Sequence, residues 1–262
     1  MNRIQWHEAV SKMKMNLVRV TTAGGGQGSG VIVPVPPNAP GNCCVLTAFH
    51  VVAHAEETGA IITIDPPGSN HRLVLHSTQR AIFKVEARDQ ALVLFNGPAS
   101  FGALDNYKFL SRDRRYMQGI ELGWLGFPAL EEAEQEACFF SGPVSAYLDD
   151  KEAYLVDGAS IHGVSGGPVF FCNDDEVVLA GIVTNYFPNQ VRPSYGAPSQ
   201  AWPGLAMFRT INPIMKLYAR QETAARPKLH PVPSEEKKDP APSKEPSREP
   251  MRTSQTGRGK RA

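Results

Sequence analysis

Three residues whose side chains together support acyl transfer occur in the order His50, Asp89 and Ser165. A serine hydroxyl is a weak nucleophile at neutral pH, and it needs an adjacent base, usually a histidine that a carboxylate orients. Ser165 lies between glycines in ASIHGVSGGPVF, residues 159–170, directly before an apolar run. A glycine-rich turn explains such a serine equally well, because Gly-x-Ser-x-Gly occurs in unrelated settings. Other residues of the chain are needed to distinguish a nucleophilic serine from a serine in a glycine-rich turn.

The order of histidines and aspartates discriminates between the folds that build this constellation. An α/β-hydrolase places its histidine after the serine, but the only histidine after Ser165 is His230, in a Pro-rich tail. A subtilisin-like enzyme needs an aspartate before its histidine. The first aspartate is Asp65, and the two histidines that soon follow, His71 and His76, lie in a strand-like run without a turn. The order histidine, aspartate, serine remains.

All three candidate residues stand at the ends of strand-like runs. CVLTAFHVV places His50 directly after an apolar run, and RDQALVLF places Asp89 directly before another. Ser165 is followed by the run PVFF. Side chains at strand ends favour a site assembled between two packed sheets.

The motifs around these residues resemble those of the trypsin/chymotrypsin-like serine peptidases. The segments are TAFH at 47–50, DQAL at 89–92 and GVSGGP at 163–168. The closest similarity is to the bacterial trypsin-like and HtrA-type peptidase domain, and it extends over roughly residues 15–220. Supporting segments follow in family order: GSGVIV at 28–33, GWLGFP at 123–128 and GIVT at 181–184. The tail beyond them is too short and polar for the peptide-binding PDZ domain that HtrA-type enzymes usually add.

Many short β-rich runs, with 23 Gly and 22 Pro in 262 residues, indicate an all-β sandwich or barrel. The resemblance implies two antiparallel six-stranded β-barrels, with a short N-terminal helix and a C-terminal helix. We expect the helix over residues 1–14, the first barrel over 15–112, and the second barrel with the terminal helix over 113–221. Residues 222–262 are rich in Pro, Ser, Lys and Glu, which predicts a disordered tail.

The resemblance also implies a role for each residue of the site. His50 is the general base and then the acid, Asp89 orients it, and Ser165 attacks the scissile carbonyl. The backbone N–H groups of Gly163 and Ser165 form the oxyanion hole, where a side chain at Gly163 would obstruct the turn. Val164 replaces the aspartate of zymogen-activated relatives, so we do not expect activation by insertion of a new N-terminus.

The substrate-binding positions of the family fall on Ala159, His162, Val183, Thr184, Asn185, Tyr186 and Ala206. Ala159 stands six residues before the serine, at the floor of the pocket, where an acid would select Arg or Lys. Val183 and Thr184 line one wall and Ala206 another, which predicts a small or medium apolar residue before the scissile bond. The strand from Thr184 to Tyr186 pairs with the peptide backbone.

The sequence predicts neither a metal nor a cofactor. His50 and His54 form His-x-x-x-His, but Val51 stands where a zinc protease needs a glutamate. GGGQGSG, residues 24–30, lacks the Gly-Lys-Ser/Thr of a phosphate loop. The four cysteines show no Cys-x-x-Cys spacing, which indicates reduced thiols in a reducing compartment: Cys43, Cys44, Cys138 and Cys172.

A formal net charge of +1 gives no global reason to expect nucleic acid or an anionic membrane as a partner. The basic end of the tail is only a weak sign of an anionic partner. No apolar stretch approaches the roughly 18 residues that span a bilayer, and the N-terminal segment lacks the apolar core of a secretory signal. We therefore expect a cytoplasmic protein whose partner is a protein or peptide substrate.

These features predict a serine endopeptidase that works without a cofactor. Two alternatives remain open: a catalytically silent peptidase fold that binds peptides or acts as a scaffold, and an esterase-like acyl hydrolase on the same fold. An active protease in the cytoplasm needs restraint. We therefore hypothesise a narrow substrate range or gating by a regulatory protein partner.

Overall fold

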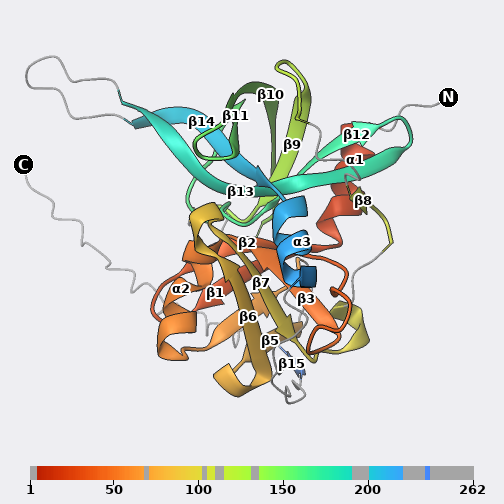
Figure 1. Cartoon of the computed structure of the whole chain (residues 1–262), viewed down its shortest axis with the longest axis vertical. Helices are drawn as coiled ribbons and strands as arrows, with labels where there is room; N and C mark the ends of the chain where they lie inside the picture. The colour runs from red at the N-terminus through yellow and green to blue at the C-terminus, as the bar shows by residue number, and fades with distance from the viewer. Residues whose placement is uncertain are drawn as a thin grey trace, which may run out of the picture.

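The computed structural model describes residues 5–67, 71–101, 105–109, 115–130, 136–190, 201–220 and 234–236. Over these residues the chain forms two mainly antiparallel β-sheets, one built largely from residues before 100 and the other from later residues. In Figure 1 strands β1 to β7, coloured red to yellow, lie below the strands of the second sheet, coloured mostly green to blue. The all-β class with two barrel-like sheets is confirmed.

The first sheet contains eight strands in the order β15-β5-β4-β1-β2-β3-β7-β6. They are β1 (Leu17–Thr22), β2 (Gln27–Ile32), β3 (Cys43–Thr47), β4 (Ile62–Asp65), β5 (His71–Leu75), β6 (Arg80–Val85), β7 (Gln90–Phe95) and β15 (Ser234–Glu236). β3 and β7 are buried along their whole length, which explains why both read as unbroken apolar runs. Among the described residues, no ladder closes this sheet between β6 and β5.

The second sheet contains seven strands in the order β12-β9-β10-β11-β14-β13-β8. They are β8 (Lys108–Phe109), β9 (Glu121–Gly126), β10 (Cys138–Leu148), β11 (Ala153–Asp157), β12 (Pro168–Asn173), β13 (Glu176–Gln190) and β14 (Ala201–Thr210). A further β12–β13 pairing closes six of them into a barrel, and the two-residue β8 adds a parallel edge to β13. Closure removes the exposed strand edges.

The strand counts differ from six in each barrel. The second barrel has six closed strands plus β8, whereas β1–β7 and β15 form an open sheet of eight. β15 lies in the segment expected to be disordered, and it pairs antiparallel with β5 from Ser234–Leu73 to Glu236–His71. The rest of that tail, residues 222–233 and 237–262, lies outside the described residues.

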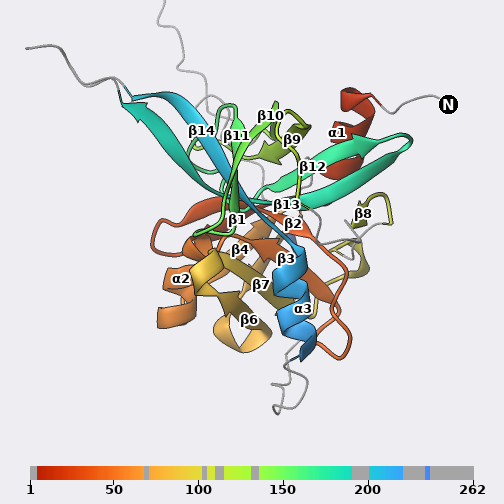
Figure 2. The same cartoon turned by 45° about the horizontal axis from the view of Figure 1, so that its top comes forward.

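Helices connect the two sheets. α1 (Trp6–Lys14) packs on the second barrel, where the Trp6 ring lies 5.4 Å from Phe139 and 5.9 Å from Phe170. α3 (Asn212–Arg220) follows β14 and contacts β6 of the first sheet. Figure 2 shows α1 against the upper barrel and α3 beside the lower sheet. The expected terminal helices are thus present at these bounds.

One apolar core joins the two halves. Leu46 and Leu92 of the first sheet belong to the same buried cluster as Leu125, Phe170 and Ile182 of the second. Burial of this shared surface fixes the relative position of the sheets, because apolar area removed from water contributes about 25 cal/mol per Å². Residues at facing strand ends are thereby held at defined positions.

The remaining elements lie in the connections. α2 (Phe49–Thr58) follows β3 after the single residue Ala48 and ends at Gly59, whose φ of 74° is a left-handed helix stop. Three short 3₁₀ turns complete the fold: η1 (Ser77–Gln79), η2 (Glu86–Arg88) and η3 (Ala99–Phe101). α2 carries His50, and η2 directly precedes Asp89.

Candidate active site

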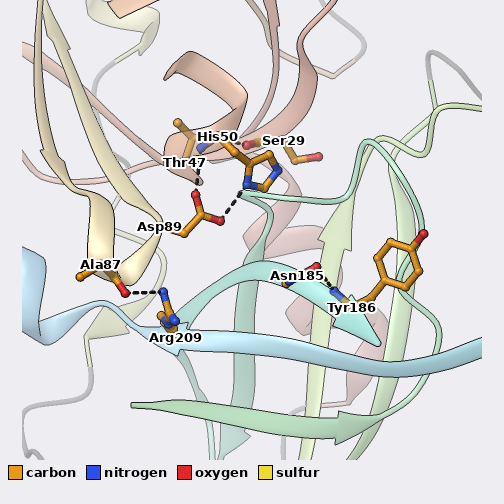
Figure 3. A network of polar contacts seen from close by, with 8 residues as sticks. All are labelled: Ser29, Thr47, His50, Ala87, Asp89, Asn185, Tyr186 and Arg209. Atoms are coloured by element: carbon orange, nitrogen blue, oxygen red, sulfur yellow. Dashed lines mark hydrogen bonds and ion pairs between the residues drawn. The ribbon is translucent and has the colours of Figure 1, made fainter. Parts of the chain in front are cut away.

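His50 and Asp89 are joined by two hydrogen bonds, which Figure 3 shows. Nδ1 of His50 lies 2.7 Å from Oδ2 of Asp89, and the backbone N–H of His50 donates to Oδ1 at 2.9 Å. A carboxylate accepts hydrogen bonds, so Nδ1 carries the proton and Nε2 of a neutral ring is left as the basic nitrogen. The histidine side chain is 52% exposed and the aspartate side chain 25%. The pair can thus present a base to a bound molecule.

Asp89 also caps the helix that carries His50. The N-cap residue of α2, Ala48, makes no side-chain cap bond, and the first turn contains no acid. Asp89 takes over this function, because its backbone carbonyl accepts from Phe49 N–H at 3.2 Å and its carboxylate accepts from His50 N–H. A negative charge at a helix N-terminus is favourable. One residue therefore orients both the ring and the backbone of His50.

The conformation of Asp89 is unusual for a side-chain-bearing residue. Its φ of 48° and ψ of 48° lie in the left-handed region, at the end of η2 and just before β7. This conformation is unfavourable by roughly 1–2 kcal/mol for residues other than glycine. Surrounding contacts must therefore hold it.

Ser165 lies in a tight turn between β11 and β12. Gly166 at φ +84° follows it, and Gly167 N–H donates to Val164 O at 2.9 Å. A side chain at Gly166 would stand 2.3 Å from Thr47 Oγ1 and 2.8 Å from Ala48 N. The serine turn thus packs directly against the end of β3 that leads into His50. A turn and an exposed nucleophile are compatible interpretations of the same segment.

Ser165 and His50 are not hydrogen-bonded to each other in the described part of the chain. The serine is half-buried, and its backbone carbonyl accepts from Ser29 N–H at 2.7 Å. Catalytic hydrogen bonds are often long without substrate and shorten when substrate binds. The serine turn therefore packs against the segment that precedes His50, without a hydrogen bond between the serine and the histidine.

Two backbone N–H groups in the serine turn have no acceptor among the described residues, those of Gly163 and Ser165. The neighbouring carbonyls point elsewhere, since His162 O accepts from Ala129 N–H at 2.8 Å and Gly163 O from Ser29 Oγ at 2.7 Å. Two unpaired donors in one turn can bind a developing oxyanion.

Glycine is required at position 163 for two reasons. Its φ is +89°, and an added Cβ would stand 2.2 Å from Phe127 O and 2.8 Å from Ala129 N. Both atoms belong to the backbone, so the clash is not relieved by a side-chain rotation. Val164 is buried in the apolar core of the second barrel, where the aspartate of zymogen-type relatives would be an unpaired charge.

Ser29 is a site residue whose role was not predicted. It is fully buried, its hydroxyl donates to Gly163 O and accepts from Phe127 N–H at 2.9 Å, and its carbonyl accepts from Thr47 Oγ1 at 2.7 Å. One residue of the first sheet thus links the serine turn, the end of β9 and the strand before His50. The sequence feature that could have indicated this role is a serine between two glycines, in a segment that packs too closely for larger residues.

The expected substrate residues divide into buried and accessible groups. Val183, Thr184 and Ala206 are buried, and Ala159 is half-buried with its carbonyl accepting from Trp124 Nε1 at 3.2 Å. A bulge in the β13–β14 pairing falls at Thr184. These residues can form walls, but none offers a charged side chain.

The accessible group surrounds the end of β13. Asn185 and His162 are exposed, and Tyr186 is half-buried and pairs with Ala206 across the strands. The rings of His162 and Tyr186 meet edge to face with their centroids 5.8 Å apart. Neighbouring Asn185 Oδ1 accepts from Tyr186 N–H at 2.8 Å (Figure 3).

The four cysteines are free. Burial raises the pKa of the Cys43 and Cys44 thiols, so both stay protonated near neutral pH. Within the described residues, no three His, Cys, Asp or Glu side chains gather in a way that could hold a metal ion.

A family model described as a trypsin-like peptidase domain matches residues 28–182, which include His50, Asp89 and Ser165. No curated protein sequence gave a match.

Several solved proteases share the fold. The HtrA-type protease AlgW, solved with a tripeptide, is 18% identical with a TM-score of 0.56 and is matched over 82% of this chain and 62% of its own. Deg5 is 17% identical with a TM-score of 0.53, over 81% and 94%. The thermostable serine protease AL20, from an extremophilic microorganism, is 14% identical with a TM-score of 0.56, over 82% and 100%.

The chain spans less than two thirds of the AlgW structure, and at these identities the likeness concerns the fold. The family match covers 28–182 of 262 residues, more than half of the chain. The chain belongs to the family of trypsin-like peptidase domains.

Proposed function

We propose that the protein is a serine endopeptidase in which His50, Asp89 and Ser165 form the catalytic triad. The observation that carries this proposal is the pair of hydrogen bonds that Asp89 accepts from the ring and the backbone of His50. They leave Nε2 as the basic nitrogen beside a turn with two unpaired N–H donors. Base, nucleophile and oxyanion donors are the three parts that acyl transfer needs.

In the first half of the reaction, Nε2 of His50 takes the proton from Ser165 Oγ as this oxygen attacks the scissile carbonyl carbon. The carbonyl oxygen becomes an oxyanion and accepts hydrogen bonds from the N–H groups of Gly163 and Ser165. Asp89 stabilises the imidazolium through the Nδ1 bond. His50 then gives its proton to the leaving amine, the C–N bond breaks, and an acyl-enzyme remains.

In the second half, His50 takes a proton from a water molecule, and the resulting nucleophile attacks the acyl carbon. The ester bond to Ser165 Oγ breaks, and His50 returns the proton to this oxygen. No external reductant, oxidant or metal enters these steps. The acid product leaves, and the triad is restored.

For the substrate, we propose a small or medium apolar residue before the scissile bond. Support comes from the absence of any charge at Ala159, Val183 and Ala206 and from the half-buried Tyr186 opposite Ala206. The backbone from Thr184 to Tyr186 would take the peptide as an added strand. We further propose that N-terminal insertion is not needed for activation, because the donors at 163 and 165 are already unpaired with Val164 in the core.

A second candidate function has one observation in its favour. Ser165 and His50 share no hydrogen bond in the described structure, as expected of a silent peptidase fold that only binds peptides. The same absence is expected of an enzyme whose serine–histidine hydrogen bond forms only when a substrate or a regulatory protein partner binds. The two candidates differ in whether peptides are cut.

Peptide cleavage by the purified protein tests the proposal. A diverse peptide library is incubated with the wild type and with Ser165→Ala, and new termini are identified by mass spectrometry. We expect cleavage after small or medium apolar residues by the wild type only. Binding of library peptides by both proteins without any cleavage would support the silent module instead.

The location of the protein stays a prediction. No helix in the described ranges has both the length and the apolar character needed to cross a membrane. The four free cysteines suit the reducing cytoplasm that the sequence suggests.

A further inference from the structure

Asp89 is held by the second barrel through two hydrogen bonds that flank it in the sequence. Arg209 Nη1 donates to Ala87 O at 3.1 Å, and Gln90 Nε2 donates to Thr210 O at 3.0 Å. Arg209 and Thr210 are consecutive residues at the end of β14. Figure 3 shows the Arg209 side chain rising from β14 to Ala87, next to the strand end that carries Asp89. The turn with Asp89 is therefore clamped from the opposite sheet.

This clamp acts where the backbone needs support. Asp89 adopts a left-handed conformation immediately after the single turn of η2. Conformations of this kind persist only where neighbouring contacts impose them. The two bonds hold Ala87 and Gln90, which lie two positions before and one position after Asp89. They therefore limit where the Asp89 carboxylate can lie.

Two buried arginines lie at the clamp, Arg209 and Arg88. Arg209 is 8% exposed, and burial lowers the pKa of its guanidinium while the nearby Asp89 carboxylate acts in the opposite direction. Arg88 lies beside it, also buried, and forms an ion pair with Glu152 of the β10–β11 turn. Two buried guanidinium groups each need an anion, because an unpaired buried charge is strongly unfavourable. Glu152 supplies one to Arg88, whereas Arg209 forms no ion pair among the described residues and has the Asp89 carboxylate only as a nearby charge.

The guanidinium of Arg209 has no hydrogen bond to any expected substrate residue in the described structure, and its Nε lacks an acceptor there. Its influence on the reaction therefore runs through Ala87 and Asp89 to His50. A change at this position should alter the geometry of the base and leave substrate binding almost intact.

We propose that Arg209 is a positioning residue of the active site, which ties the Asp89 turn to β14 and thereby sets the orientation of the His50 imidazole. The role as part of a catalytic site rests on the proposed peptidase function. The geometric part of the proposal, control of the His50–Asp89 hydrogen bond, does not depend on that function.

The test compares Arg209→Met and Arg209→Lys with a matched control, Arg80→Met. Arg80 is a similarly buried arginine, 6% exposed, that donates to the carbonyls of Leu75, Ala55 and Ala60, away from Asp89. Two quantities are measured on the full chain: kcat and KM for a library-derived peptide, and the downfield proton NMR signal of the His50 Nδ1–H. Gln90→Leu removes the second bond of the clamp and is measured where Arg209→Met does not fold.

We expect Arg209→Met to lower kcat about 10- to 100-fold with KM nearly unchanged, because small misplacements of catalytic groups have effects of this size. The Nδ1–H signal should shift or broaden, and Arg209→Lys should recover part of both losses. Arg80→Met should lower the melting temperature and leave kcat and the signal as in the wild type.

The proposal is overturned if Arg209→Met keeps the wild-type signal and kcat, or if Arg80→Met changes both to the same extent. The NMR comparison keeps the two proposals separate. Suppose that the wild type cuts no peptide but shows the Nδ1–H signal, and that Arg209→Met loses this signal. Such a result refutes the peptidase function and supports the clamp.

Discussion

Asp89 accepts hydrogen bonds from His50 twice, at 2.7 Å from the ring and at 2.9 Å from the backbone N–H. The carboxylate thus holds the imidazole and the helix start that carries it as one unit. The N-cap residue of α2, Ala48, makes no side-chain cap bond. The orientation of the base and the beginning of the helix therefore depend on the same side chain, that of Asp89. A change at Asp89 should therefore affect both chemistry and local stability.

Asp89→Asn is expected to lower kcat by roughly 10⁴-fold, because an amide can donate to Nδ1 and so favours the wrong tautomer of His50. The same change removes the negative charge at the start of α2 and the counter-charge of Arg209, so the melting temperature should fall as well. Steady-state kinetics and thermal unfolding are measured on the same preparation. Wild-type turnover in Asp89→Asn would show that Asp89 does not orient the base.

Ser29→Ala should weaken the serine turn without touching the triad. The change leaves Phe127 N–H and Gly163 O unsatisfied in a buried site, and each such loss destabilises a protein by about 1–3 kcal/mol. We expect lower stability in denaturant unfolding together with reduced kcat, since Gly163 borders the proposed oxyanion hole. The exposed Ser77 provides the control, and an equal effect of Ser77→Ala would contradict the assigned role of Ser29.

Gly163→Ala should abolish most of the activity. The Cβ would stand 2.2 Å from Phe127 O, so the turn must move and the two N–H donors with it. Loss of one oxyanion donor lowers kcat about 10²- to 10³-fold. Gly119→Ala is the control, since Gly119 has a similar φ of +85° but open space around its Cβ position. If both variants lose activity alike, backbone strain rather than the oxyanion hole explains the result.

Ala159→Asp should redirect cleavage towards Arg and Lys. A carboxylate at the expected pocket floor would pair with a basic side chain, whereas the hydrogen bond from Trp124 to the Ala159 carbonyl would be kept. Library profiling reads the change directly. An unaltered cleavage pattern would place the floor of the pocket elsewhere.

Alkaline pH should destabilise the fold through Tyr116. Burial raises the pKa of its phenol above the ordinary value of about 10. The folded state then keeps the proton while the unfolded state releases it, so the stability present below pH 10 falls as the pH rises above this value. The hydroxyl has no partner in the described structure. Tyr116→Phe should therefore flatten the alkaline loss in denaturant unfolding with little effect at pH 7, and an unchanged alkaline slope would contradict this.

Sequence and structure agree best where short motifs encode local geometry. The turn around Ser165 needs glycine at 163 and 166, and the apolar runs before His50 and after Asp89 correspond to fully buried strands. These features follow from neighbouring residues, which explains why a single chain predicts them.

The features that were not predicted depend on contacts between distant segments. Arg209 reaches Ala87 across 122 positions, and Ser29 reaches Gly163 across 134. The left-handed conformation of Asp89 is held by such contacts, although aspartate is among the few residues other than glycine that adopt it. The open eight-stranded first sheet likewise depends on pairing of β15 with β5, far apart in the chain.

Active-site labelling tests the central claim most directly. The wild type, Ser165→Ala and His50→Ala are incubated with a fluorophosphonate, and the modified residue is located by mass spectrometry. An activated serine attacks phosphorus and displaces fluoride, so we predict one adduct at Ser165 of the wild type, none in Ser165→Ala and strongly slowed labelling in His50→Ala. No adduct on wild-type Ser165, or equal labelling rates in the wild type and His50→Ala, would contradict a His50-activated nucleophile.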